Sequence, residues 1–162
     1  MKYLFVLLFF VLLMSATSAQ NWKELNQAPI GLKYNIPQGW FVSGYIYGKS
    51  CNCNSATINL SKDQTINMAI FTDTIDLDSL KRQKVWDYSF APFTLDTEEL
   101  QTDYFTFERA MSTWVEDKKA TVLRFSMSYK ESQYLIYFWG DLKDITKNAK
   151  VIELILKSIQ GI

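Results

Sequence analysis

Apolar and polar positions alternate in several stretches of the chain, with the period of two that marks a half-buried strand. In Ala120–Tyr129, Leu123, Phe125 and Met127 share one face and Arg124 and Ser126 the other. The same alternation runs through Leu32–Ile36 and ends at the turn Pro37-Gln38-Gly39. We expect further strands at Trp40–Tyr47, Ala56–Leu60, Ile66–Phe71, Tyr104–Trp114 and Gln133–Trp139. Short turns join most neighbours, so these strands pair antiparallel.

One strand differs from the others because both of its faces are apolar. Tyr134, Ile136 and Phe138 alternate with Leu135, Tyr137 and Trp139. A strand apolar on both sides is typical of the centre of a sheet that is covered on both faces.

Two segments have the periodicity of helices. Residues 77–86 follow Thr74 and Asp76, either of which can cap a helix. A calcium site at Asp73, Asp76 and Asp78 is the alternative, but the spacing lacks the glycine and the distal glutamate of a calcium loop. The second helix follows the N-cap residue Asp141. Its apolar face consists of Ile145, Ala149, Ile152, Leu156 and Ile159, with Gly161 just beyond the end.

The sequence therefore predicts an α+β protein, with an antiparallel β-sheet, helices packed on its faces and a long C-terminal helix. No repeat, low-complexity tract or linker divides it, so we expect one domain over residues 20–162. We expect Gln20–Gln27 to form a short N-terminal arm, of at most one helical turn.

The N-terminus has the organisation of a cleaved signal peptide. Lys2 precedes an apolar run that ends at Met14, and small residues follow as far as Ala19. A membrane anchor is the alternative, but twelve apolar residues span only about 18 Å of a hydrocarbon core of about 30 Å. We expect residues 1–19 to be removed and the mature chain to be secreted or periplasmic, without stable membrane insertion.

Charge and composition exclude several classes of function. After removal of residues 1–19 the net charge is −1, with both signs interspersed, so nucleic acid is not an expected partner. The sequence contains no histidine, which removes the commonest general base and most catalytic zinc sites. We expect no catalytic residue, no cofactor and no metal.

Cys51 and Cys53 stand in a polar, turn-like segment. An exported chain can form a disulfide between them, although such a small ring is strained. A redox pair and half of a soft-metal site are the alternatives, and no third cysteine or histidine completes the metal site.

The layout and two motifs resemble the PsbP-like family. The motifs are the stretch from Leu32 to Trp40, which includes Pro37 and Gly39, and the stretch from Ile155 to Ile159; Tyr134 to Gly140 also resembles that family's penultimate strand. The resemblance implies an α/β/α sandwich, a fold shared with Ran-binding Mog proteins and DcrB-like bacterial proteins.

What the resemblance implies about function is binding, because family members act as photosystem II subunits, small-GTPase partners or adaptor chaperones. The chain departs from these members in having no metal-binding histidine and no long basic N-terminal extension, and its export signal is incompatible with a nuclear role. No functional residue transfers from the family, and Pro37, Gly39 and Trp40 match it as structural positions.

The leading hypothesis is a non-enzymatic accessory protein that contacts a protein partner in the cell envelope or outside the cell. Aromatic side chains are abundant, and most are expected in the core, but some could form a binding face. The candidates for that face are Trp22, Trp40, Tyr45, Tyr47 and Trp86, followed by Tyr88 and Phe93.

Two alternatives remain open. A carrier of a small apolar ligand or lipid would show an apolar pocket of several hundred cubic ångströms between sheet and helices. A hydrolase that uses paired carboxylates would need two acids in one cleft. The available acids are Glu98, Glu99, Asp103, Glu108, Glu116 and Asp117.

Overall fold

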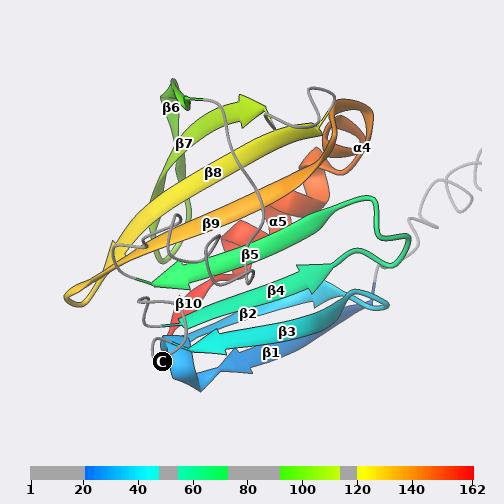
Figure 1. The fold of residues 1–162 in the computed structure, drawn as a ribbon. Coiled ribbons are helices and arrows are strands. Elements are labelled where there is room, and N and C mark those ends of the chain that lie inside the picture. The colour runs from blue at the N-terminus through cyan, green and yellow to red at the C-terminus, as the bar shows by residue number, and fades with distance from the viewer. Residues whose placement is uncertain (1–20, 48–54, 73–91, 114–119) are drawn as a thin grey trace, which may run out of the picture.

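The structure, a computed structural model, describes residues 21–47, 55–72, 92–113 and 120–162 (Figure 1). Among these residues, the first half contains β1 (Trp22–Gln27), the 3-10 helix η1 (Ala28–Ile30), β2 (Leu32–Pro37), β3 (Phe41–Tyr47), β4 (Ser55–Leu60) and β5 (Asn67–Thr72). The second half contains β6 (Thr94–Gln101), β7 (Thr106–Thr113), β8 (Ala120–Tyr129), β9 (Ser132–Asp141), α4 (Leu142–Lys147), α5 (Ala149–Ser158) and β10 (Gln160–Gly161).

The strands form two antiparallel sheets. The larger has the order β3-β4-β5-β9-β8-β7-β6, and the smaller has the order β1-β2-β10. In the larger sheet β9 lies between β5 and β8, which confirms the central position that its two apolar faces predict.

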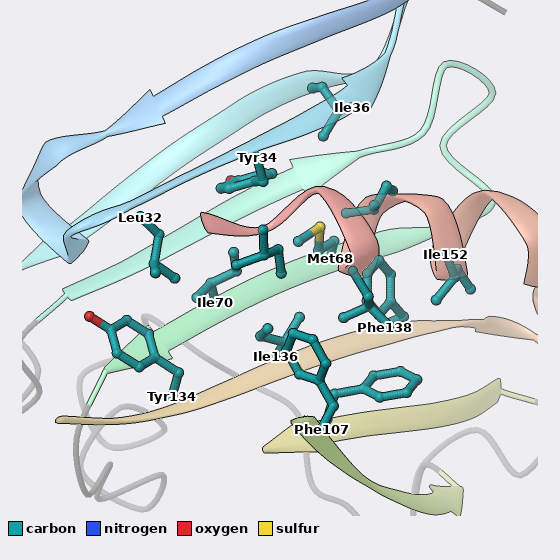
Figure 2. Close-up of a cluster of buried hydrophobic side chains, with 14 of the residues drawn as sticks. Leu32, Tyr34, Ile36, Met68, Ile70, Phe107, Tyr134, Ile136, Phe138 and Ile152 are labelled. Atoms are coloured by element: carbon teal, nitrogen blue, oxygen red, sulfur yellow. The ribbon is translucent and has the colours of Figure 1, made fainter. Parts of the chain in front are cut away.

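One face of the larger sheet, the smaller sheet and α5 enclose a common hydrophobic core. Figure 2 shows Tyr34 and Ile36 of β2 opposite Met68 of β5, with Ile152 of α5 beside Phe138 of β9. All of these side chains are buried. The expected α+β class and antiparallel pairing are confirmed, and the strands are divided between two sheets because β1, β2 and β10 pair only with one another.

Hydrogen bonds between residues far apart in sequence join η1 to β9 and β2 to α5. The Tyr134 hydroxyl donates a buried hydrogen bond of 2.7 Å to the Ile30 carbonyl, and the Asn35 amide donates one of 2.9 Å to Ser158 Oγ. Burial of such polar groups is tolerated because each has a partner. These bonds hold β2 and α5 in fixed positions relative to β9.

The C-terminal helix is present but interrupted. The chain leaves α4 at Asn148, whose amide and Nδ2 both donate to the Asp144 carbonyl, and begins α5 at the next residue. Ile145, Ile152 and Leu156 are buried as the apolar periodicity predicts. Two details of the expectation are wrong: Ala149 is exposed, and Gly161 lies in strand β10, not just beyond a helix end.

The second face of the larger sheet is also apolar. Phe71, Tyr137 and Trp139 are buried there, and the Phe71 and Tyr137 rings meet edge to face at 5.7 Å. The helix expected at residues 77–86 lies outside the described residues, as do residues 1–19. Among the described helices, none is long and apolar enough to cross a membrane.

Two strands differ from the sequence-based expectations. Trp22–Gln27, expected as an arm or a helical turn, is strand β1, which pairs along its whole length with β2. β6 was not expected, because a register shift between Leu95 and Glu99 interrupts its period of two.

Candidate functional site

A hollow opens beside α5 over the outer strands of the larger sheet. We call it the helix groove; it has a volume of about 340 Å³. Its lining comes from β6 (Glu99, Leu100), β7 (Arg109), β8 (Leu123, Phe125) and α5 (Ala149, Lys150, Ile152, Glu153, Leu156). The volume lies at the lower end of the range for small-molecule sites.

The groove lies between α5 and the three strands β6, β7 and β8. Phe125, Ile152 and Leu156 close the bottom of the groove and are buried, whereas Leu123 is half-buried. Met111 lies directly opposite Leu123 in the β7–β8 register and is 52% exposed. An apolar strip therefore continues from the core to the surface along β8 and β7.

Charged groups surround this apolar floor. Glu153 accepts a hydrogen bond from Lys157, and a longer one of 3.4 Å from Lys150. These bonds, with that from Lys157 dominant, lower the pKa of Glu153 below its ordinary value. Arg109 adds a base from β7. The arrangement accommodates an apolar group under a rim that carries both signs of charge.

A second hollow, of about 420 Å³, involves the same outer strands. We call it the acidic hollow, because it contains Glu99 and Glu108. The other lining residues are Tyr104, Phe105, Thr106, Ser126, Met127, Ser128 and Gln133. Glu99 and Glu108 are direct partners in the β6–β7 register, and Ser126 Oγ donates a hydrogen bond of 3.4 Å to Glu108 Oε2.

A third cluster lies under the second face of the sheet. The Arg124 guanidinium sits 4.5 Å from the centre of the Phe93 ring, a cation–π contact. Burial raises the pKa of the neighbouring Tyr137 hydroxyl, and the charge of Arg124 opposes that shift. This arrangement explains how an arginine is accommodated among aromatic side chains.

Of the aromatic residues that the sequence suggested for a binding face, the structure describes the side-chain burial of Trp22, Trp40 and Phe93. Trp40 is 8% exposed and belongs to the core, and Trp22 is half-buried against it. Phe93 is half-buried against Arg124 and Tyr137. Tyr45 and Tyr47 lie in β3, an edge strand of the larger sheet, and Trp86 and Tyr88 lie outside the described residues.

The candidate acids are partly brought together. Glu99 and Glu108 meet at the acidic hollow, whereas Asp103 lies exposed in the β6–β7 turn. Glu98 lies in β6, and Glu116, Asp117, Cys51 and Cys53 lie outside the described residues. In the described part of the chain, no three acids or cysteines are grouped as metal ligands would be.

Sequence reasoning missed the residues of the helix groove as a set. Leu100 belongs to the unexpected strand β6, and Leu123 and Ile152 were interpreted as ordinary core positions. The available signal is Met111, an apolar residue directly after the apolar Ala110 on β7, which lies in register with Leu123.

No protein-family model matches this sequence, and no curated protein does. Solved structures are similar to it in fold. The cyanobacterial PsbP protein CyanoP from Synechocystis sp. PCC 6803 has a TM-score of 0.58 at 9% identity, over 91% of this chain and 96% of that one. The Ran-binding protein Mog1p from Saccharomyces cerevisiae has a TM-score of 0.51 at 8% identity, over 88% of this chain and 96% of that one. The chain therefore has the PsbP-like fold, and at these identities the likeness extends to the fold alone.

Proposed function

We propose that this protein is a non-enzymatic accessory protein that binds a protein partner through the outer strands of its larger sheet. The observation that carries the proposal is the helix groove, which brings apolar side chains to the surface beside the border strand β6. A protein–protein interface usually has an apolar core surrounded by a polar rim. The yeast neighbour of similar fold is itself a Ran-binding protein, which supports binding as a use of this fold.

Binding without catalysis is supported by the chemistry of the candidate acids. Glu99 and Glu108 are exposed, and Glu108 accepts its hydrogen bond from a serine. The sequence offers no histidine to act with them as a base. We assign these carboxylates to recognition.

We also propose that the chain is exported and acts in the periplasm or outside the cell, after cleavage behind Ala19. The support is the pattern of Lys2, an apolar run and small residues. Intact mass and N-terminal sequencing of protein from its native host test this step. A mature chain that begins at Gln20 is expected, and a chain that retains Met1 in the native host would contradict it.

The binding proposal is tested by site-specific photo-crosslinking in native cells. A photoreactive residue at Met111, on the groove strip, should give one discrete adduct with another protein. The same residue at Lys23, which is exposed on β1 of the smaller sheet, is the matched control and should not give that adduct. Leu123→Asp in the Met111 variant should abolish the adduct. Equal labelling from both positions, or none from either, would refute the proposal.

A second candidate function follows from the volume of the groove, because a groove of about 340 Å³ with an apolar floor and a charged rim also fits a small amphipathic ligand or one end of a lipid. Native mass spectrometry of the protein purified from its host distinguishes the two. A retained small molecule that is lost in Leu123→Asp favours the carrier function, and a bare chain favours the protein partner.

A further inference from the structure

The strand β6 has a free long edge. It is the last strand of the larger sheet, and it pairs with β7 on one side only (Figure 1). Among the residues that the structure describes, no backbone hydrogen bond joins Glu99 or Gln101 to a strand beyond β7. An unpaired edge is a template on which another extended chain can pair.

The turn after β6 determines which backbone groups point outward. Thr102 N–H donates to the Phe105 carbonyl at 2.9 Å, so these two residues form a hydrogen-bonded pair. Hydrogen-bonded and non-hydrogen-bonded pairs alternate along antiparallel strands. Glu99 opposite Glu108 is therefore a non-hydrogen-bonded pair, as is Gln101 opposite Thr106. The amides and carbonyls of Glu99 and Gln101 point away from β7, toward the free edge.

The side chains on the two faces of this edge differ in character. Glu99 and Glu108 lie directly opposite each other, in the closer of the two pair geometries, and like charges so placed repel. In the described part of the chain neither carboxylate forms an ion pair. A cation supplied beside Glu99 would relieve this repulsion.

The opposite face of the same edge is apolar. Leu100 is half-buried and borders the helix groove, with Leu123 and Phe125 beyond it. On that side the acid Glu153 already accepts hydrogen bonds from Lys157 and Lys150, so it does not attract a further base as Glu99 does. Successive side chains of a strand point to opposite faces, so one added strand meets both environments at alternate positions.

We propose that the β6 edge receives an extended segment of a partner protein as an added strand, with a basic residue beside Glu99 and apolar residues on the Leu100 side. The inference rests on the proposed binding function and specifies the chemistry of its partner. Main-chain hydrogen bonds to Glu99 and Gln101 supply affinity, and the two faces supply specificity. A one-residue slip places the basic residue among the apolar side chains next to Leu100 and an apolar residue beside Glu99, so the alternating pattern selects one register.

The test uses a short, fluorescently labelled peptide in which lysine alternates with valine, and fluorescence anisotropy with the full chain. The control peptide has the same composition, with the lysines and valines in separate blocks. Two more versions of the alternating peptide carry N-methyl groups on one or the other set of alternate amides. Only one set can face β6, so one version should lose at least about tenfold in affinity and the other should bind as the parent does.

Protein variants test the electrostatic part. Glu99→Gln should weaken binding roughly two- to fivefold, from the range of cross-strand charge pairs, and Glu108→Gln, one strand farther from the added chain, should weaken it less. Glu24→Gln, an exposed acid on β1, is the matched control and should bind normally. Loss of a repulsive pair does not destabilise the sheet, so unchanged or raised urea midpoints for both test variants separate binding from folding.

Equal binding of the block peptide, or equal effects of the two N-methylated versions, would overturn the inference. So would undiminished binding by the double variant Glu99→Gln/Glu108→Gln. Failure of the peptide while the Met111 crosslink to a native partner persists refutes the added strand alone and leaves the binding function intact. Absence of both refutes the two together.

Discussion

Gly140 is the position at which the smallest change should disturb the described fold most. It lies near the end of the central strand β9, just before α4 begins. A methyl group at this position would overlap the backbone carbonyl oxygen of Thr65, well inside the 3.0 Å that real contacts of this kind respect, and would lie 3.2 Å from Ile66 Cδ1. We therefore expect Gly140→Ala to destabilise the protein, although alanine is ordinarily the better strand residue.

The magnitude follows from what holds Thr65 in place. Ile66 N–H donates a buried hydrogen bond of 2.9 Å to Ser61 Oγ, and Ser61 N–H donates one of 2.8 Å to the Ile66 carbonyl. The Thr65 carbonyl cannot move without straining these bonds. Overpacking costs roughly 1–3 kcal/mol and a weakened hydrogen bond about 1 kcal/mol, while replacing glycine returns roughly 0.5–1 kcal/mol. We expect a net loss of about 2 kcal/mol.

Urea unfolding followed by tryptophan fluorescence measures this loss. The midpoint should fall with an unchanged dependence on urea, and the melting temperature should fall by roughly 5–10 °C. Thr65→Ala in the same chain should not rescue Gly140→Ala, because the obstacle is a backbone atom. A free energy of unfolding within about 0.5 kcal/mol of the parent would refute the reasoning.

Three further predictions concern the core, the C-terminal strand and pH. Gly161→Ala should also destabilise the protein, because its methyl group would overlap the Tyr129 ring. Here Tyr129→Leu should restore stability, and additive effects of the two substitutions in a double-mutant cycle would contradict this. Ile152 is 2% exposed, so Ile152→Asp should unfold the chain by burying an unpaired charge. Leu154, on the outer side of the same helix, is 38% exposed, and Leu154→Asp should leave the circular dichroism spectrum unchanged. A folded Ile152→Asp protein would oppose our account. Hydrogen bonds from Ser61 and Thr65 lower the pKa of Asp63 below 3.8, so the stabilisation they give is complete above pH 3.8 and is lost as the pH falls through the lowered pKa. Asp63→Asn should therefore reduce the loss of stability at acid pH. Curves of unfolding free energy against pH that run parallel for the parent and the variant would argue against this.

Periodicity predicted the parts of the fold in which one face of an element is uniformly buried. The alternation of Leu123, Phe125 and Met127 gave β8 the correct faces, and the turn at Gly39, which has a φ of +97°, lies where Pro37 and Gly39 indicated it. β1 was missed because Leu25 and Gln27 are its only buried side chains, so its pattern reads as polar.

The candidate site was harder to predict because it depends on where elements end. Met111 indicates apolar surface on β7, but nothing in the sequence indicates that α5 and β6 line one groove with it, since that depends on how α5 packs on the sheet. The repulsive pair of Glu99 and Glu108 depends on a register shift that breaks the period of two within β6. The break at Asn148 was likewise invisible, because Ile145 and Ile152 keep their helical spacing across it.

The pairing of β2 with β10 has a consequence for how the chain acquires its shape. Gln160 lies opposite Lys33, so the third strand of the smaller sheet is supplied by the end of the described chain, long after the second has been made. In a chain that emerges residue by residue from a ribosome, the edge of β2 that β10 occupies therefore stays unpaired until residues 160–161 have been made. Such distant pairing slows folding. The smaller sheet thus acquires its third strand only after every strand of the larger sheet has been synthesised.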